Sequence, residues 1–215
     1  RGVTYYEESN PKLADANIHP VLLHGTRIAM AHNGTLFGFQ KMKFHLLPYI
    51  KDCYSEQISG TTDSEWIYAL LLSQIKTPDP DLHQIIEALE QSLGIIRRLR
   101  EQHDIKVSSG VNLFLSDGIH LLATRFAFDF GRYVTPVAPT LFNFQSLWFT
   151  MGTDYGLHAG EWRMASGERR VDSLLIASEP LTRDTTTWIE VPEYTLVAAT
   201  KSEDGIKIGF KDLDH

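Results

Sequence analysis

The sequence predicts a single α+β domain in which amphipathic helices lie between runs of short strands. Its 215 residues are 43% hydrophobic and 11% aromatic, which suffices to fill one large core and excludes disorder for most of the chain. Apolar residues recur at helical spacing between residues 63 and 100, and short apolar runs bounded by turn residues follow. No internal repeat or linker is evident, so we expect residues 1–215 to form one domain of mostly antiparallel strands.

The first elements are predicted to be a loop and a hairpin. The polar, turn-rich start of the chain leads to His19, which the following proline biases toward extended backbone. Residues 21–23 and 27–31 are apolar and separated by a glycine, which predicts a buried hairpin. Its second strand is expected to stop at His32-Asn33-Gly34.

Three helices are predicted next. Residues 39–50 carry apolar side chains at helical spacing and favour a short helix. Thr62 and Glu65 have the spacing of a capping box, in which each side chain accepts the other's backbone amide, so a second helix starts at Asp63. A longer helix from Asp81 keeps a three-four apolar spacing to Leu99, with arginines in its last turns that complement the helix dipole.

Strands dominate after residue 110. Two hairpin connections are predicted, one at residues 116–118 and one at residues 202–205, because both contain a turn-forming Asp-Gly pair. The predicted strands are residues 111–115, 119–126, 133–137, 147–151, 173–177, 194–200 and 206–210.

Charge and composition restrict the partners. The net charge is −7 and basic residues form no cluster longer than a pair, which argues against nucleic acid. The longest uncharged stretch, residues 133–153, contains two prolines and several threonines, so we expect no membrane partner. Cys53 is the only cysteine and no internal disulfide can form, which favours a reducing, cytoplasmic compartment. A small or zwitterionic ligand is the expected partner.

Several common chemistries have no motif in this chain. The nine histidines show no metal-ligand spacing, and no phosphate loop, dinucleotide fingerprint or nucleophile elbow is present. We therefore expect no metal and no cofactor. Cys53 has no base nearby in the sequence and is interpreted as a passive thiol.

Asn33 and Gly34 are the first candidate site. The Asn33 side-chain amide and the Gly34 backbone amide can point at one spot, and paired donors of this kind make an oxyanion hole. The alternative is a plain tight turn, because Asn-Gly is the commonest tight-turn dipeptide.

Two further candidates are an acid at a helix start and two residues at the chain start. Asp63 can pair with a ligand ammonium group, although an acid in a first helical turn is also stabilised by the macrodipole alone. Arg1 and Thr4 offer a guanidinium and a hydroxyl that can grip a carboxylate, although a terminal arginine is normally just solvated.

Four motifs in chain order resemble the glutaminase domain of class II glutamine amidotransferases. They are Arg1-x-x-Thr4, the Asn-Ile-His-Pro of residues 17–20, Ala31-His32-Asn33-Gly34 and the Thr-Thr-Asp-Ser-Glu of residues 61–65. The resemblance is specific over residues 1–75 and looser over residues 112–125 and 173–197. There, the Ser-Glu-Pro-Leu-Thr of residues 178–182, followed by Trp188, resembles the small stand-alone branch that includes the γ-glutamyl amidohydrolase of ergothioneine synthesis.

This resemblance implies a fold and a role for each site residue. The fold is a four-layer αββα sandwich, two antiparallel sheets flanked by helices, of the N-terminal-nucleophile hydrolase type. Asn33 and Gly34 would form the oxyanion hole, Asp63 would bind the α-ammonium of a glutamyl group, and Arg1 with Thr4 would hold its α-carboxylate. The substrate would be glutamine or a γ-glutamyl amide. A homo-oligomer or an acceptor-domain partner is left open.

The sequence departs from the family at its start. The family uses an N-terminal cysteine whose α-amine acts as base for its thiol, giving a thioester intermediate. This chain starts at Arg1, so we expect the segment with the nucleophile to precede it. The alternative is a non-catalytic amino-acid-binding or structural subunit on the same scaffold.

Overall fold

The computed structural model describes residues 27–128, 145–158, 160–165 and 170–213, and it shows the α+β fold that the sequence predicts. Four α-helices and one 3₁₀-helix are described: α2 (Phe39–Met42), η1 (Lys43–Tyr49), α3 (Asp52–Ser55), α4 (Asp63–Gln74) and α5 (Leu82–Gln102). The strands are β1 (Ala29–Gly34), β2 (Ser109–Ser116), β3 (His120–Arg125), β4 (Ala127–Phe128), β5 (Trp148–Gly152), β6 (Asp154–His158), β7 (Glu161–Ala165), β8 (Ser173–Ala177), β9 (Ile189–Glu190), β10 (Thr195–Ser202) and β11 (Gly205–Asp212).

The described strands form three antiparallel sheets. The largest has six strands in the order β1-β2-β3-β10-β11, with β4 paired to β2. A three-stranded sheet has the order β8-β5-β9, and β6 pairs with β7 as a separate hairpin. Both predicted hairpin connections are confirmed, since β2 pairs with β3 and β10 pairs with β11.

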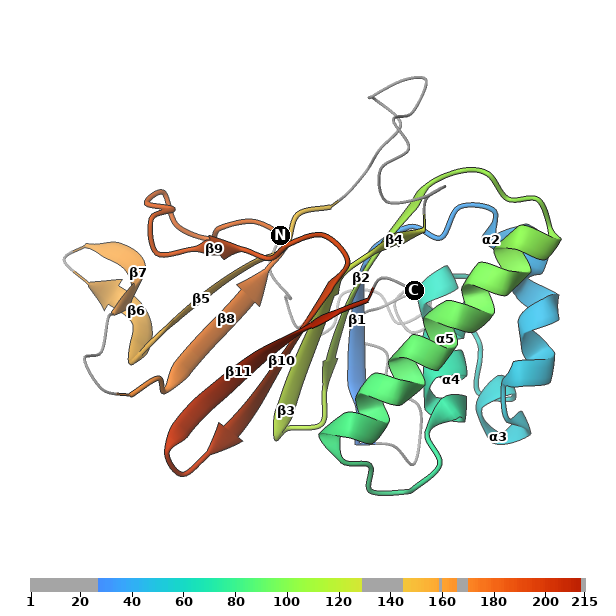
Figure 1. Cartoon of the computed structure of the whole chain (residues 1–215), viewed down its shortest axis with the longest axis horizontal. Helices are drawn as coiled ribbons and strands as arrows, with labels where there is room; N and C mark the ends of the chain where they lie inside the picture. The colour runs from blue at the N-terminus through green and yellow to red at the C-terminus, as the bar shows by residue number, and fades with distance from the viewer. Residues whose placement is uncertain (1–26, 129–144, 159, 166–169, 214–215) are drawn as a thin grey trace.

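The six-stranded sheet separates two cores. Side chains alternate across it, so Leu113 and Leu115 face the core shared with the helices, whereas Phe114 packs with Phe149 and Ile176 of the smaller sheet. Helices α4 and α5 therefore cover one face, and β5, β8 and β9 lie against the other (Figure 1). This arrangement places the first turn of α4 and the end of β8 on opposite sides of β1.

Three of the four predicted layers are found in the part of the chain that the structure describes. These layers are the helices, the six-stranded sheet and the three-stranded sheet. A second helical layer is not among these residues. Within the same residues no helix has the length and apolar character needed to cross a membrane.

The prediction of one short helix over residues 39–50 was wrong in type. The chain forms one turn of α-helix and then a 3₁₀-helix that contains Pro48. A proline has no backbone N–H and its ring clashes with the carbonyl four residues earlier, so it disfavours an α-helix here. The two short helices still bury Met42 of α2 and Leu46 of η1, which are among the residues that gave the helical spacing.

Candidate active site

Asn33 and Gly34 are the last two residues of β1, not a tight turn. In the register with β2, Asn33 lies opposite Asn112 and Gly34 opposite Val111. The strand thus ends within His32-Asn33-Gly34, as expected, whereas the alternative of a plain tight turn at Asn-Gly was wrong because strand pairing continues through both residues.

Gly34 sits where β1 presses against β2. Its φ is +154°, and a Cβ at this position would lie 2.0 Å from the carbonyl oxygen of Gly110 and 2.9 Å from His32 Nε2. The next backbone amide, that of Thr35, donates to the same Gly110 oxygen over 3.1 Å. Only a glycine therefore permits this approach of the two strands.

The side chain of Asn33 points between the two sheets. Its Nδ2 donates to Ser178 Oγ over 2.6 Å, and Ser178 follows the last residue of β8. An amide nitrogen carries two donor hydrogens, so the second remains for a ligand. Asn33 is half-buried, so part of its surface is accessible to solvent.

Asp63 approaches the same end of β1 from the helical side. It is the first residue of α4, as predicted, and its Oδ2 accepts the Leu36 amide over 2.6 Å. Its Oδ1 accepts the Ser64 amide over 2.9 Å, and 17% of the side chain is exposed. The structure thus brings Asp63 to the loop that follows Asn33 and Gly34.

His32 ties β1 to this helix start. Its Nδ1 lies 2.9 Å from Ser64 Oγ and 3.9 Å from Asp63 Oδ1, and only 1% of its side chain is exposed. Together with the Leu36 contact, this fixes the distance between the α4 terminus and the end of β1.

The predicted capping box was wrong, although the helix starts where it was expected. Thr62 makes no side-chain cap hydrogen bond. The buried carboxylate of Glu65 instead accepts the amides of Ser59 and Gly60, over 2.9 and 2.6 Å. Glu65 therefore folds the preceding loop back onto α4. A capping box does form at α5, between Asp81 and Gln84.

Arg100 clamps the loop after β1, a role that the sequence did not indicate. Its Nη1 donates to the Phe37 carbonyl and to Ser109 Oγ, each over 2.9 Å, and its Nη2 donates to the Val107 carbonyl. Burial lowers the pKa of this guanidinium to about 10, so it remains charged at neutral pH. From the sequence, Arg100 was predicted only as a cation that complements the helix dipole. Its buried contacts are with carbonyl and hydroxyl oxygens, and no acidic residue in the sequence indicated a buried ion pair.

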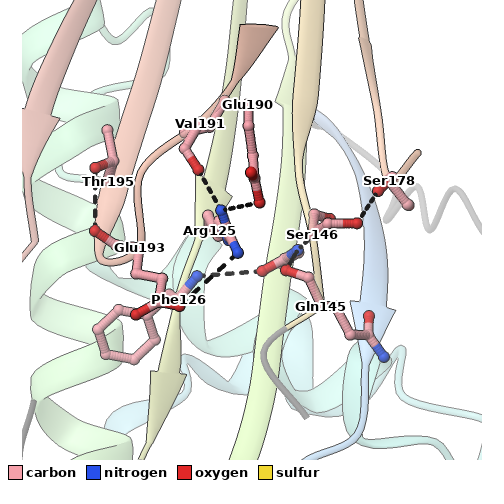
Figure 2. A network of polar contacts seen from close by, with 10 residues as sticks. Arg125, Phe126, Gln145, Ser146, Ser178, Glu190, Val191, Glu193 and Thr195 are labelled. Carbon is pink, nitrogen blue, oxygen red and sulfur yellow. Dashed lines mark hydrogen bonds and ion pairs between the residues drawn. The ribbon is translucent and has the colours of Figure 1, made fainter. Parts of the chain in front are cut away.

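A second polar network links the two sheets (Figure 2). Asn112 is fully buried; its Nδ2 donates to the carbonyls of Gln145 and Ser146, and its Oδ1 accepts the Phe126 amide over 3.1 Å. Ser146 Oγ donates to the Ser178 carbonyl over 2.6 Å. An asparagine inside the apolar run of residues 111–115 was the available signal for this site.

Arg125 extends this network along the inter-sheet side. Its Nη1 donates to Glu190 Oε1 over 2.8 Å and to the Val191 carbonyl over 2.6 Å (Figure 2). The residue is 9% exposed and connects β3 to β9. These contacts anchor the smaller sheet on the larger one.

The other predicted residues either lie elsewhere in the fold or fall outside the part of the chain that the structure describes. Arg1, Thr4 and His19, like the predicted strand at residues 133–137, lie outside the described residues. Cys53 is exposed on α3, just after Lys51, whose amide donates to Ser73 in the last turn of α4. No group of three or more His, Cys, Asp or Glu side chains suited to a metal occurs within the described ranges.

Comparisons with known proteins identify the family and the fold. A family model described as "Glutamine amidotransferases class-II" matches residues 7–208. The probable glutamine amidotransferase DUG3 of Saccharomyces cerevisiae is 28% identical over 203 residues, which are 88% of this chain and 54% of that protein. An uncharacterized protein of Methanocaldococcus jannaschii is 33% identical over 111 residues, 51% of this chain and 26% of that protein. The chain thus spans about half or less of these relatives.

A solved structure shares the fold. The glutamine aminotransferase class-II domain protein from Silicibacter pomeroyi superposes with a TM-score of 0.57 at 21% identity, over 88% of this chain and 69% of that one. Since the family model spans nearly the whole sequence, the chain belongs to the class II glutamine amidotransferases.

Proposed function

We propose that the protein containing this chain hydrolyses the side-chain amide of glutamine, or a γ-glutamyl amide, to give ammonia or an amine. The observation that carries the proposal is that Asn33, Gly34 and Asp63 lie around the end of β1. Asn33 supplies a side-chain amide from the inter-sheet side and Gly34 a backbone amide, while the Asp63 carboxylate reaches the loop after β1 from the helical side. Such a site suits a substrate with a positive α-ammonium group and an amide that becomes negatively charged during reaction.

The reaction proposed is acyl transfer through a thioester. A thiolate attacks the amide carbon, negative charge develops on the carbonyl oxygen, and the nitrogen leaves after taking a proton. Water then cleaves the thioester, so glutamine and water give glutamate and ammonia. The second hydrogen of Asn33 Nδ2 and the Gly34 amide would stabilise the oxygen in both tetrahedral intermediates.

The nucleophile in this proposal is an N-terminal cysteine that is not among the 215 residues, with its own α-amine as base. Cys53 does not suit the role. It lies on exposed α3, next to a segment bonded to the last turn of α4, whereas Asp63 begins that helix. The 12 residues of α4 extend about 18 Å, so the segment that carries Cys53 and the candidate site lie near opposite ends of this helix.

Separate residues would recognise the α-ammonium group and the α-carboxylate of the substrate. Asp63 is held by the Leu36 and Ser64 amides, yet each carboxylate oxygen has a further lone pair for an ammonium group. Arg1 and Thr4 would hold the α-carboxylate.

The test is product formation by the full-length protein. Equal amounts of ammonia and glutamate released from glutamine, or of amine and glutamate from a γ-glutamyl amide, would support the proposal. Calorimetric binding of glutamine with no release would favour a non-catalytic binding module. Neither binding nor release, together with co-purification of a partner that carries an acceptor site, would favour a structural subunit.

A further inference from the structure

We infer that Ser178 is a positioning residue that orients the Asn33 side-chain amide for oxyanion binding; this inference rests on the function proposed above. The contact is direct, because Asn33 Nδ2 donates to Ser178 Oγ over 2.6 Å. Ser178 directly follows β8 of the smaller sheet and Asn33 lies in β1 of the larger one, 145 residues apart in the chain.

The orientation of an asparagine amide matters because its two ends are opposite in character. Rotation by half a turn exchanges a donor nitrogen for an acceptor oxygen, and an oxygen facing an oxyanion would repel it. When Ser178 Oγ accepts one hydrogen of Nδ2, this hydrogen bond holds the nitrogen in a fixed direction. The second hydrogen of Nδ2 then remains available to the oxyanion. A donor held in advance costs no reorganisation during the reaction.

Ser178 is itself held by a closed set of contacts between the sheets. Ser146 Oγ donates to the Ser178 carbonyl over 2.6 Å, as Figure 2 shows. Asn112 Nδ2 donates to the Ser146 carbonyl over 3.3 Å, and Asn112 lies directly opposite Asn33 in the β1–β2 register. Two neighbouring asparagines thus reach across to two linked serines, which fixes the position of Oγ relative to β1.

Kinetics of the full-length protein would test the role. Ser178→Ala is expected to lower kcat about tenfold with little change in KM, because the donor is misplaced but not removed. Ser178→Thr retains the hydroxyl and is expected to stay within about twofold of the unmodified enzyme. The matched control is Ser173→Ala at the other end of β8, whose hydroxyl donates to the Thr153 carbonyl over 3.2 Å. It should leave kcat unchanged.

A double-mutant cycle separates positioning from a structural effect. Ser178→Ala should have no further effect on kcat in an Asn33→Ala background, since no amide is left to orient. Independent, multiplicative losses would overturn the inference. The inference would also be overturned if Ser178→Thr lost as much kcat as Ser178→Ala. The same holds if Ser173→Ala lost as much kcat as Ser178→Ala.

A readout independent of activity distinguishes this inference from the proposed function. In the ¹⁵N spectrum, Ser178→Ala should accelerate solvent exchange of the Asn33 side-chain NH₂ protons, whereas Ser173→Ala should not. Unchanged exchange in Ser178→Ala would overturn the inference even in an active enzyme. An Asn33→Ala enzyme with full turnover would instead remove the oxyanion role itself, whatever the exchange rate.

Discussion

Gly34 shows how a single residue fixes the geometry of the site. A Cβ there would lie 2.0 Å from the Gly110 oxygen, which is backbone and cannot move aside without separating β1 from β2. We predict that Gly34→Ala lowers the free energy of unfolding by about 3 kcal/mol or more and abolishes measurable turnover. Urea denaturation and ammonia release would measure both effects.

The matched control is Gly209→Ala in β11. A Cβ at Gly209 meets nothing within 4 Å, so this variant should change stability by less than about 0.5 kcal/mol. If the two alanine variants were equally stable, the close contact at Gly34 would not limit the fold.

Asp63 is expected to act on substrate binding. Asp63→Asn preserves the shape of the side chain but removes the charge, so KM for glutamine should rise about tenfold or more, with a smaller change in kcat. Asp52→Asn, another first-turn acid but on exposed α3, is the control and should leave KM unchanged. A normal KM in Asp63→Asn would contradict ammonium binding by this carboxylate.

At the scale of elements, Arg100 joins the end of α5 to the loop after β1. Replacing it leaves the Phe37 and Val107 carbonyls without their donor. We predict that Arg100→Met costs about 2–4 kcal/mol of unfolding free energy, because buried acceptors lose their hydrogen bonds.

Arg98 on the same helix is exposed, and Arg98→Met should cost less than about 0.5 kcal/mol in the same urea titration. Equal costs for the two variants would show that the loop does not depend on the Arg100 contacts.

The β2–β3 turn carries a pH-dependent contribution. Burial alone would raise the pKa of Asp117, but hydrogen bonds from the His120 amide, the His120 ring and the Ile119 amide outweigh it and lower the pKa below its usual value of 3.8. A depressed pKa in the folded state means that the stabilisation is present above about pH 4 and is lost as pH falls through the folded pKa.

We therefore predict that Asp117→Asn is less stable than the unmodified protein at pH 7, and that the difference shrinks toward pH 2. Urea unfolding at several pH values measures it. A difference that grew on acidification would have the wrong sign and would contradict this assignment.

Elements with one buried face were predictable from the sequence, and elements without one were not. Helix α5 follows its predicted range closely because its apolar spacing records the face that packs. The β6–β7 hairpin was missed: most of its side chains are exposed or half-buried, so no alternation marks it. The Glu65 contacts were missed for another reason, because a carboxylate can reach several nearby amides and the sequence does not say which.

At the scale of the whole molecule, the candidate site lies where three layers meet. Asp63 comes from the helical layer, Asn33 and Gly34 from the six-stranded sheet, and Ser178 from the segment directly after β8 of the smaller sheet. The first three were predicted as site residues from local motifs. It could not pair Asn33 with Ser178 or Arg100 with Phe37, because those contacts depend on how the layers pack.

The measurement that tests this account most directly is steady-state ammonia release from glutamine by the full-length protein and its Asn33→Ala variant. If the end of β1 is an oxyanion site, the variant should lose about a hundredfold or more in kcat, with KM within about threefold and an unchanged urea midpoint. An Asn33→Ala enzyme that turns over glutamine as fast as the unmodified protein would contradict the central claim.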